Sequence, residues 1–271
     1  MQSANLKNAY LRCSCETYEQ LEALVKTPSV ELIYVDAAFF DADSFRETVA
    51  AIHRGKGGIG KKAVLRFPHV FRTDGRKYFD GIKEKISAAG FDGFLLRSIE
   101  EVLWLKGSGI EGPVILDHTV YNFNSYTDDE IRLLTGLEDF ESAYSPELNS
   151  REIKAQGEKR ELVVYGRAPL MVSAQCIRRT SLRCDKRESV MYLKDRTGAM
   201  MPVKNVCRFC YNEILNAVPT CIFDLEDEIT KIAPSSVRYE FTTENADEVS
   251  GILGGKMPGN FTRGHFHRGV E

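Results

Sequence analysis

Short β-rich runs alternate with helical stretches over the first two thirds of this 271-residue chain, and this rhythm constrains the fold more than any other feature. Parallel neighbouring strands need a crossover connection long enough to hold a helix, so the alternation is typical of a parallel sheet covered by helices. The runs expected to form strands are residues 9–13, 31–36, 62–67, 91–96, 113–117, 140–144 and 161–166.

Signals at the ends of the helical stretches support this division. Thr17, Ser98 and Thr127 each stand three residues before an acid or an amide, which is the spacing of a capping box at a helix start. Glycine favours the left-handed conformation that ends many helices, and the glycines expected to do so are Gly90, Gly109 and Gly136.

The rhythm changes after Cys176. Residues 190–203 predict two strands around an Arg-Thr-Gly turn, and residues 211–216 predict a helix or a turn. The alternation then resumes with a helix at 224–231, a strand at 236–243 and a helix at 245–253.

Seven βα units before this change and one after it make eight. We therefore predict a single (β/α)₈ TIM-barrel-like domain over residues 1–271, a length that suits this fold. Residues 176–221 form a cysteine-rich, basic insertion within it that carries a β-hairpin. An open, doubly wound sheet is the alternative.

Composition excludes several classes of protein. With 43% hydrophobic residues and a net charge of −3, the chain is neither a disordered tail nor a general binder of polyanions. No apolar run approaches the roughly 18 residues that span a bilayer, and residues 1–7 lack the apolar segment of a signal peptide. We expect a soluble, cytoplasmic protein that has no membrane partner.

Five of the seven cysteines fall within 46 residues. Cytosolic thiols stay reduced, so such a cluster indicates a metal site more often than disulfides. Cys176, Cys184, Cys207 and Cys210 supply the four thiolates that a [4Fe–4S] cluster or a tetrahedral zinc ion needs. The seven residues between Cys176 and Cys184 exceed the usual zinc-knuckle spacing, which favours the iron–sulfur cluster and leaves zinc as the alternative. Cys221 is the rival fourth ligand.

Two further cysteines, Cys13 and Cys15, lie two residues apart in a predicted strand and therefore share one face of it. We interpret both as small core residues.

The insertion is also basic. Residues 178–208 hold nine lysines or arginines against three acids, in a chain that is acidic as a whole. Such a segment can bind RNA through counterion release, although a solvated hairpin with ordinary surface charges has the same composition. The basic residues are Arg178, Arg179, Arg183, Lys186, Arg187, Lys194, Arg196, Lys204 and Arg208.

Polar residues follow several of the predicted strands, and the carboxyl ends of barrel strands form the active face of this fold. Asp117, His118, Glu147 and Arg167 are the candidates to bind a carboxylate or phosphate or to relay a proton. Taken singly, each also has the position of a helix cap. Other polar residues at predicted strand ends are Asp36, Arg66, His69, Arg97, Asn122 and Ser145. Near the end of the chain, His265 and His267 could bind a metal, but a tail strand across the barrel mouth is the commoner outcome.

Several segments in order resemble the peptidase U32 family, also called collagenase-like proteases. They are Ser145-Pro-Glu-Leu148, Glu161–Val172 running into Cys176, Leu193-Lys-Asp-Arg196, Cys210–Asn216 and Thr262–Val270. The resemblance covers roughly half of the chain. It also predicts that the chain corresponds to the C-terminal barrel of a longer protein. Many members have six residues where this chain has seven between Cys176 and Cys184.

The resemblance implies a TIM-barrel-like domain whose four cysteines bind a [4Fe–4S] cluster. Better understood members act in oxygen-independent hydroxylation of a tRNA or ribosomal-RNA base or of a ubiquinone precursor, with prephenate as the hydroxyl source in the RNA cases. For this chain it implies RNA as the partner of the basic segment, and Arg167 or Arg97 as the receiver of a small carboxylate donor.

Two alternatives remain at this stage. The family name implies a peptidase, but the sequence holds neither His-Glu-x-x-His nor Gly-x-Ser-x-Gly, so hydrolysis would need another arrangement such as a cysteine with His118. The other alternative is a zinc-stabilised module without catalytic activity that binds RNA or a protein partner.

Overall fold

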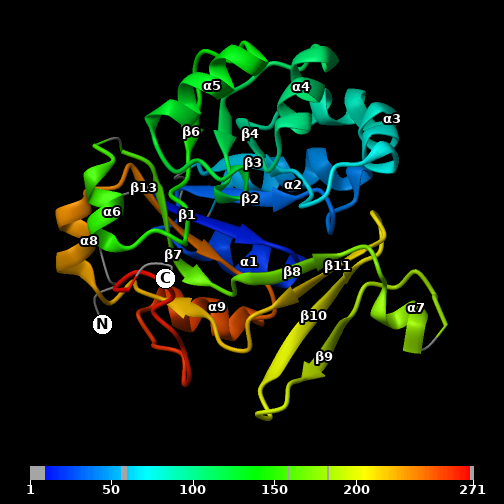
Figure 1. The fold of residues 1–271 in the computed structure, drawn as a ribbon. Coiled ribbons are helices and arrows are strands. Elements are labelled where there is room, and N and C mark those ends of the chain that lie inside the picture. The colour runs from blue at the N-terminus through cyan, green and yellow to red at the C-terminus, as the bar shows by residue number, and fades with distance from the viewer. Residues whose placement is uncertain (1–9, 56–59, 158, 182, 269–271) are drawn as a thin grey trace.

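The computed structural model of the chain describes residues 10–55, 60–157, 159–181 and 183–268. Its main sheet is curled and contains eight parallel strands (Figure 1). They are β1 (Tyr10–Cys15), β2 (Leu32–Asp36), β3 (Lys62–Arg66), β4 (Gly93–Leu96), β5 (Val114–Leu116), β6 (Glu141–Ser142), β7 (Glu161–Gly166) and β13 (Ser236–Glu240). The seven runs predicted as strands and the run at 236–243 therefore all hold strands.

These strands lie in the order β7-β13-β1-β2-β3-β4-β5-β6, so β7 and β6 stand at the two ends of the row. These ends meet: Ala143 and Glu161 form a parallel bridge, and the Tyr144 N–H donates to the Glu161 carbonyl at 2.8 Å. The protein is thus a mixed α/β fold with a curled parallel sheet. The short antiparallel strand β12 (Thr220–Cys221) pairs with β7.

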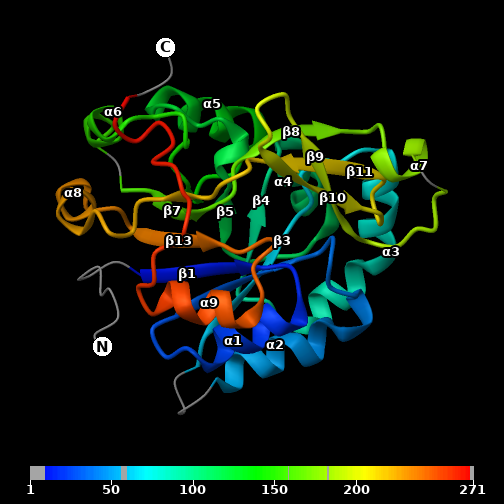
Figure 2. The same ribbon diagram turned by 90° about the horizontal axis from the view of Figure 1, so that it is seen from below.

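A helix follows each parallel strand. In chain order they are α1 (Tyr18–Lys26), α2 (Phe45–Arg54), α3 (Thr73–Ala89), α4 (Ile99–Ser108), α5 (Ser125–Thr135), α6 (Ser150–Ala155), α8 (Glu226–Ile232) and α9 (Ala246–Leu253). Helices α1, α2, α3 and α9 cover one side of the curled sheet (Figure 2). Within the described part of the chain, no helix combines the length and apolarity that crossing a membrane requires.

The expected helix ends are largely confirmed. Thr17 forms the complete capping box of α1, and the Ser98 side chain caps α4. The capping box expected at Thr127 is wrong, because Asn124 caps α5 and Thr127 is already in its first turn. The residues that follow α3, α4 and α5 in the left-handed conformation are Gly90, Gly109 and Gly136, as expected.

Strands within residues 169–215 form a second, antiparallel sheet in the order β8-β11-β10-β9, which begins before the predicted insertion of residues 176–221. Its elements are β8 (Pro169–Ser173), α7 (Ile177–Ser181), β9 (Val190–Lys194), β10 (Met200–Val206) and β11 (Tyr211–Leu215). The predicted hairpin is confirmed as β9 and β10. The helix or turn predicted at residues 211–216 is wrong: this segment is β11, which takes its hydrogen-bond partners from β10 and β8.

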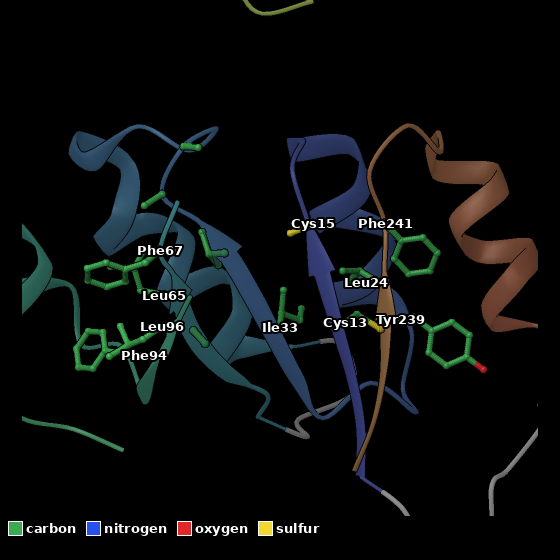
Figure 3. Packing of buried hydrophobic residues seen from close by; sticks show 14 of the residues in the cluster. Cys13, Cys15, Leu24, Ile33, Leu65, Phe67, Phe94, Leu96, Tyr239 and Phe241 are labelled. Atoms are coloured by element: carbon green, nitrogen blue, oxygen red, sulfur yellow. The ribbon is translucent and has the colours of Figure 1, made fainter. Parts of the chain in front are cut away.

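Apolar side chains fill the space between the main sheet and its helices. Cys13 and Cys15 lie there on the same face of β1, fully buried, beside Leu24, Ile33 and Tyr239 (Figure 3). Burial raises the pKa of the Cys13 thiol above its usual value. Both cysteines therefore act as core residues, as their spacing predicted.

Phe79 of α3 links this core to the second sheet. Its ring stacks on Phe67 with 4.4 Å between the ring centres, and its centre lies 6.1 Å from that of the Phe209 ring. Phe209 stands between Cys207 and Cys210 in the sequence. Phe79→Ala should lower the free energy of unfolding by about 3–5 kcal/mol, because it leaves a cavity in a packed aromatic group. Urea denaturation measures this. The exposed control Leu133→Ala should change it by about 0.5 kcal/mol or less, and equal losses would refute the assignment.

Candidate functional site

The inner face of the curled sheet carries buried charges beside a small apolar layer of Leu32, Tyr34, Val64, Leu95 and Ile115. The charged side chains are arginines and carboxylates from several strands, each at most 8% exposed. They are Arg12, Asp36, Arg66, Arg97, Asp117, Glu161, Arg238 and Glu240. A buried charge is costly unless it is paired and hydrogen-bonded, so these side chains must be matched to one another.

Arg238 of β13 is the centre of this network and is fully buried. Its Nη2 donates to Asp117 Oδ1, and its Nε lies 3.3 Å from Glu161 Oε1 and 3.6 Å from Glu240 Oε1. The guanidinium also lies 5.5 Å from the centre of the Tyr34 ring. One arginine therefore contacts three carboxylates, and each of these also faces a second arginine: Glu161 faces Arg12, Glu240 faces Arg66 and Asp117 faces Arg97.

Asp117 directly follows β5 and was a predicted catalytic residue. Burial by itself would raise its pKa, but Arg238, His118 and Arg97 outweigh burial and hold the pKa well below its usual value. The carboxylate is therefore ionised at neutral pH and serves as a counter-ion.

His118, the next predicted catalytic residue, lies between two carboxylates. Its Nε2 is 3.8 Å from Asp117 Oδ1 and 3.9 Å from Glu240 Oε2. Burial would raise the pKa of Glu240, but Arg238 and Arg66 lower it well below its usual value. The imidazole thus has an ionised carboxylate on each side, which suits a group that holds or passes a proton.

These three side chains are the described group whose ligand atoms come close enough to hold a metal ion, all within 4.8 Å of one another. The carboxylates are already engaged, however. Asp117 Oδ1 accepts from Arg238 and its Oδ2 lies 3.2 Å from Arg97 Nε, while Glu240 Oε1 lies 3.3 Å from Arg66 Nη2. A divalent cation here would face three guanidinium groups, so the arrangement suits proton transfer better than metal binding.

His69, in the loop between β3 and α3, links the network to Glu213 of the second sheet. Its Nδ1 lies 3.1 Å from Arg97 Nη2 and 3.2 Å from Glu213 Oε1. Burial and then Arg97 lower the pKa of the imidazole, which favours its neutral form. With a donor and an acceptor both facing Nδ1, the ring can present either a lone pair or an N–H at Nε2.

A cavity of about 740 Å³ opens at this end of the sheet, a size suited to a small-molecule ligand. His69 and His118 line it, and Glu147 stands exposed at its wall. Its other polar lining residues include Thr119, Ser145, Asn216 and His265, and its apolar walls include Tyr144, Leu162, Leu170 and Phe266. Asp117 contacts His118 on the side away from the cavity lining. Three of the four predicted catalytic residues, Asp117, His118 and Glu147, therefore lie in or next to this cavity.

Arg167, the fourth, does not line this cavity. Its guanidinium donates to Thr243 Oγ1 at 3.2 Å and to the carbonyls of Asn216 and Ala217 at 3.0 and 2.6 Å. These bonds tie the loop after β11 to the loop after β13. The contacts show a role in holding loops together.

The tail of the chain runs beside β12. Thr262 bridges to Thr220, Phe266 is buried, and His267 Nε2 lies 3.2 Å from the carboxylate of Glu228. His265 lines the cavity. In the described part of the tail, the predicted strand is limited to the single Thr220–Thr262 bridge.

The second sheet docks on the main sheet through buried ion pairs. Lys204 of β10 donates to Glu16 at 2.5 Å and lies 2.8 Å from Glu213 Oε2. Nη1 of Arg208 donates to the carbonyls of Ala37 and Phe40 at 3.0 and 2.7 Å. Two of the nine basic residues of the insertion therefore serve this contact: Lys204 is buried and Arg208 is half-buried.

The four predicted ligand cysteines lie around one edge of the second sheet. Burial raises the pKa of Cys207, and the nearby Glu188 and the thiols of Cys176, Cys184 and Cys210 raise it further. The thiols of Cys176, Cys184 and Cys210 therefore lie near enough to Cys207 to affect its ionisation. Cys207 and Cys210 also line an open cavity of about 520 Å³ together with Lys186, Glu188 and Arg208.

Cys221, the rival ligand, lies elsewhere. It is fully buried in β12, and its Sγ is 3.9 Å from the Met257 sulfur. The structure thus gathers Cys207 with the other three thiols and leaves Cys221 in the core.

The exposed charge of the basic segment is smaller than its composition suggests. Arg178 is half-buried and pairs with Asp185, while Lys204 and Arg208 face the main sheet. Six basic side chains remain exposed beside three exposed acids. They are Arg179, Arg183, Lys186, Arg187, Lys194 and Arg196.

Sequence reasoning missed the network's other half: Glu161, Arg238, Glu240, Lys204 and Glu213. Each is a charged residue inside a strand, and Arg238 and Glu240 stand two apart, on one face of β13. Charged residues at alternate positions of a β-rich run are the signal that could have found them.

Comparisons with known proteins do not identify the chain. No family model matches it, and no curated protein does. Solved structures with some likeness include a protein assigned as a fructose-1,6-biphosphate aldolase from Coccidioides immitis, with a TM-score of 0.38, 15% identity and coverage of 57% of this chain and 63% of that one. Another is the YdjI aldolase from Escherichia coli K12, with a TM-score of 0.38, 15% identity and coverage of 58% and 66%. The matched part is less than two thirds of either chain, and at this similarity the likeness supports no conclusion about activity.

The network predicts a pH-dependent cost for losing its central cation. Arg238→Met leaves three buried carboxylates without their shared partner and should lower the free energy of unfolding at pH 7 by about 3–5 kcal/mol. The depressed pKa values of Asp117 and Glu240 in the native protein contribute stability above the unfolded pKa values, and this contribution is lost as pH falls. In the variant those pKa values rise, so the difference between the two proteins should shrink as the pH falls from 7 to 3, below the unfolded pKa values of about 4.

Urea denaturation at both pH values measures this difference. Arg196→Met, at the exposed tip of the β9–β10 hairpin, is the matched control and should cost about 0.5 kcal/mol or less at either pH. A difference for Arg238→Met that stays constant or grows on acidification would contradict the network's role.

Proposed function

We propose that this chain is an iron–sulfur protein that hydroxylates a base in RNA without molecular oxygen. The observation that carries the proposal is the grouping of four thiols, Cys176, Cys184, Cys207 and Cys210, beside the sheet that docks at the cavity end of the fold. This is the ligand set expected from the resemblance to the U32 family.

The spacing of the cysteines in the sequence supports a [4Fe–4S] cluster over zinc, because the seven residues between Cys176 and Cys184 exceed the usual zinc-knuckle spacing. In a cubane each thiolate would bind a different iron. A bound cluster would supply electron transfer or, with one iron left without a protein ligand, a binding position for substrate.

We further propose that the curled sheet is a complete (β/α)₈ barrel. The Ala143–Glu161 bridge and the eight strand–helix pairs in chain order support this. The 740 Å³ cavity would then lie at the carboxyl ends of the strands, where barrel enzymes bind their substrates.

Within that cavity, the chain's own residues suit a small carboxylate donor such as prephenate, and a base. His69 and His118 present ring nitrogens to the ligand, and Arg97 supports His69 from behind. Asp117 and Glu240 hold His118 in place and balance its charge when it carries a proton. Tyr144 and Phe266 form apolar walls that exclude water.

The exposed basic side chains around the cysteines support RNA as the partner. Phosphates release counterions when lysine and arginine neutralise them, and this drives binding without reading sequence. Of the two other candidate functions, a zinc-stabilised module shares both the thiols and the basic face. A peptidase needs a nucleophile beside His118, and the described polar neighbours of that imidazole are the carboxylates of Asp117 and Glu240.

Metal analysis after anaerobic purification tests the cofactor. The protein should be brown and hold about four irons per chain, because a cubane contains four. Cys207→Ser should lose most of the iron, and Cys221→Ala should keep it, since Cys221 is in the core. A colourless protein with one zinc would exclude the iron–sulfur proposal and favour the zinc module.

RNA binding is tested by salt dependence. Arg183→Glu combined with Arg187→Glu should weaken binding of a tRNA probe at low salt by more than tenfold and make the affinity less dependent on salt concentration, because two phosphate contacts are lost. The matched control is Lys26→Glu combined with Lys62→Glu. Lys26 is exposed at the end of α1, and Lys62 is exposed at the start of β3. Filter binding across salt concentrations measures both. Equal affinities in the two variants would remove the basic face from the proposal.

The peptidase alternative has a separate test. Gelatin hydrolysis that is abolished by His118→Ala would favour a peptidase.

A further inference from the structure

Asn205 of β10 is a buried amide next to one of the four ligand thiols. It is 2% exposed, and its Oδ1 accepts from the Cys176 Sγ at 3.8 Å. Its Nδ2 donates to the carbonyl and to the hydroxyl of Ser189, both at 3.1 Å. The same side chain thus bridges the two ends of the loop that carries Cys176 and Cys184.

This hydrogen bond depends on the thiol proton. A metal-bound cysteine is a thiolate and has no proton to donate, so Oδ1 would face a negatively charged sulfur. Rotation of the amide by half a turn replaces that repulsion with an N–H···S hydrogen bond from Nδ2. Asparagine can make either hydrogen bond, because its side-chain amide has an NH₂ donor and a carbonyl acceptor.

The surroundings can accept the rotated amide. Oδ1 would then face Ser189, whose hydroxyl can donate to it while accepting from Arg178 Nη1 at 2.8 Å. The Ser189 carbonyl would lose Nδ2 but keep the Asn205 backbone N–H, which donates to it at 3.0 Å. After the rotation Oδ1 would also lie near the Ser189 carbonyl oxygen, and the hydrogen bond from the serine hydroxyl offsets the repulsion between these two oxygens. Each buried polar group therefore keeps a partner.

We propose that Asn205 is a positioning residue whose side-chain amide donates a hydrogen bond to the Cys176 sulfur when that sulfur is a metal ligand, and so raises the reduction potential of the bound cluster. This inference rests on the proposed function. Hydrogen bonds to ligand sulfurs stabilise the more negatively charged, reduced state, which is how neighbouring groups tune iron–sulfur potentials.

Asn205→Asp tests the inference, because aspartate has the same shape and no amide donor. Asn212→Asp is the matched control: Asn212 pairs directly with Asn205 across β10 and β11, is fully buried, and donates to the carbonyls of Ser173 and Gln175. Both variants add a carboxylate at neighbouring positions, but only one removes the donor to sulfur. The protein is reconstituted anaerobically with iron and sulfide, and the cluster is titrated with a reductant in the presence of redox dyes.

We expect Asn205→Asp to keep about four irons per chain, the number in a cubane, and to have a lower reduction potential than both the native protein and Asn212→Asp. Resonance Raman spectra supply a second readout. The Fe–S(Cys) stretching bands should shift in D₂O for the native protein and Asn212→Asp, and this shift should be lost in Asn205→Asp. Equal potentials in the two variants, or an unchanged D₂O shift in Asn205→Asp, would overturn the inference.

Ser189→Ala is the second variant if Asn205→Asp does not fold. It removes the hydroxyl that pairs with the rotated amide, so the potential should fall in the same direction by a smaller amount; an unchanged potential would count against the inference. If the native protein binds zinc and no iron, the proposed function fails but the hydrogen bond is still testable. In cobalt-substituted protein the thiolate-to-cobalt band should move to longer wavelength in Asn205→Asp and not in Asn212→Asp, and identical bands would overturn the inference.

Discussion

The pairing of Arg238 with Asp117, Glu161 and Glu240 inside the curled sheet is the interaction on which the rest of the structure depends. A fully buried guanidinium requires carboxylates at short range, and these come from β7, from β13 itself and from the end of β5. The strands that supply them must therefore face one another across the interior. Gly166, at the end of β7, lets β13 approach, because a Cβ there would lie 2.7 Å from that of Glu240. A polar interior thus determines where the sheet curls.

The same electrostatic requirement extends to the second sheet. Glu213 of β11 would be a costly buried carboxylate alone, and burial would raise its pKa, but Lys204, His69 and Arg97 hold the pKa well below its usual value. Glu16 is less well balanced: burial, together with Glu213 and Asp36 and against the effect of Lys204, raises its pKa to about 7. Docking therefore leaves one carboxyl that titrates near neutral pH at the junction of the two sheets, where a pH change can alter their contact.

Local pattern explains why the strands, most helix ends and the hairpin could be predicted, because β-rich runs, capping residues and glycines act within a few residues. The failures share a different cause. Strand β11 depends on partners up to 46 residues away, since Leu215 pairs with Pro169. The helix α5 begins earlier than expected, so Asn124 caps it in place of Thr127. Likewise, spacing could not decide between Cys207 and Cys221, since only the fold shows that Cys221 packs in the core.

Strand β11 connects the two places where chemistry is proposed. It begins directly after Cys210, its first residue Tyr211 accepts from the His69 backbone N–H at 3.0 Å, and Glu213 contacts the His69 ring. The turn that carries Cys207 and Cys210 therefore leads directly into a strand whose other contacts position an imidazole of the cavity. Since Lys204 and Glu213 pair across the same ladder, the strand cannot shift without disturbing a buried ion pair. Strand β11 thus fixes where this turn lies relative to the cavity.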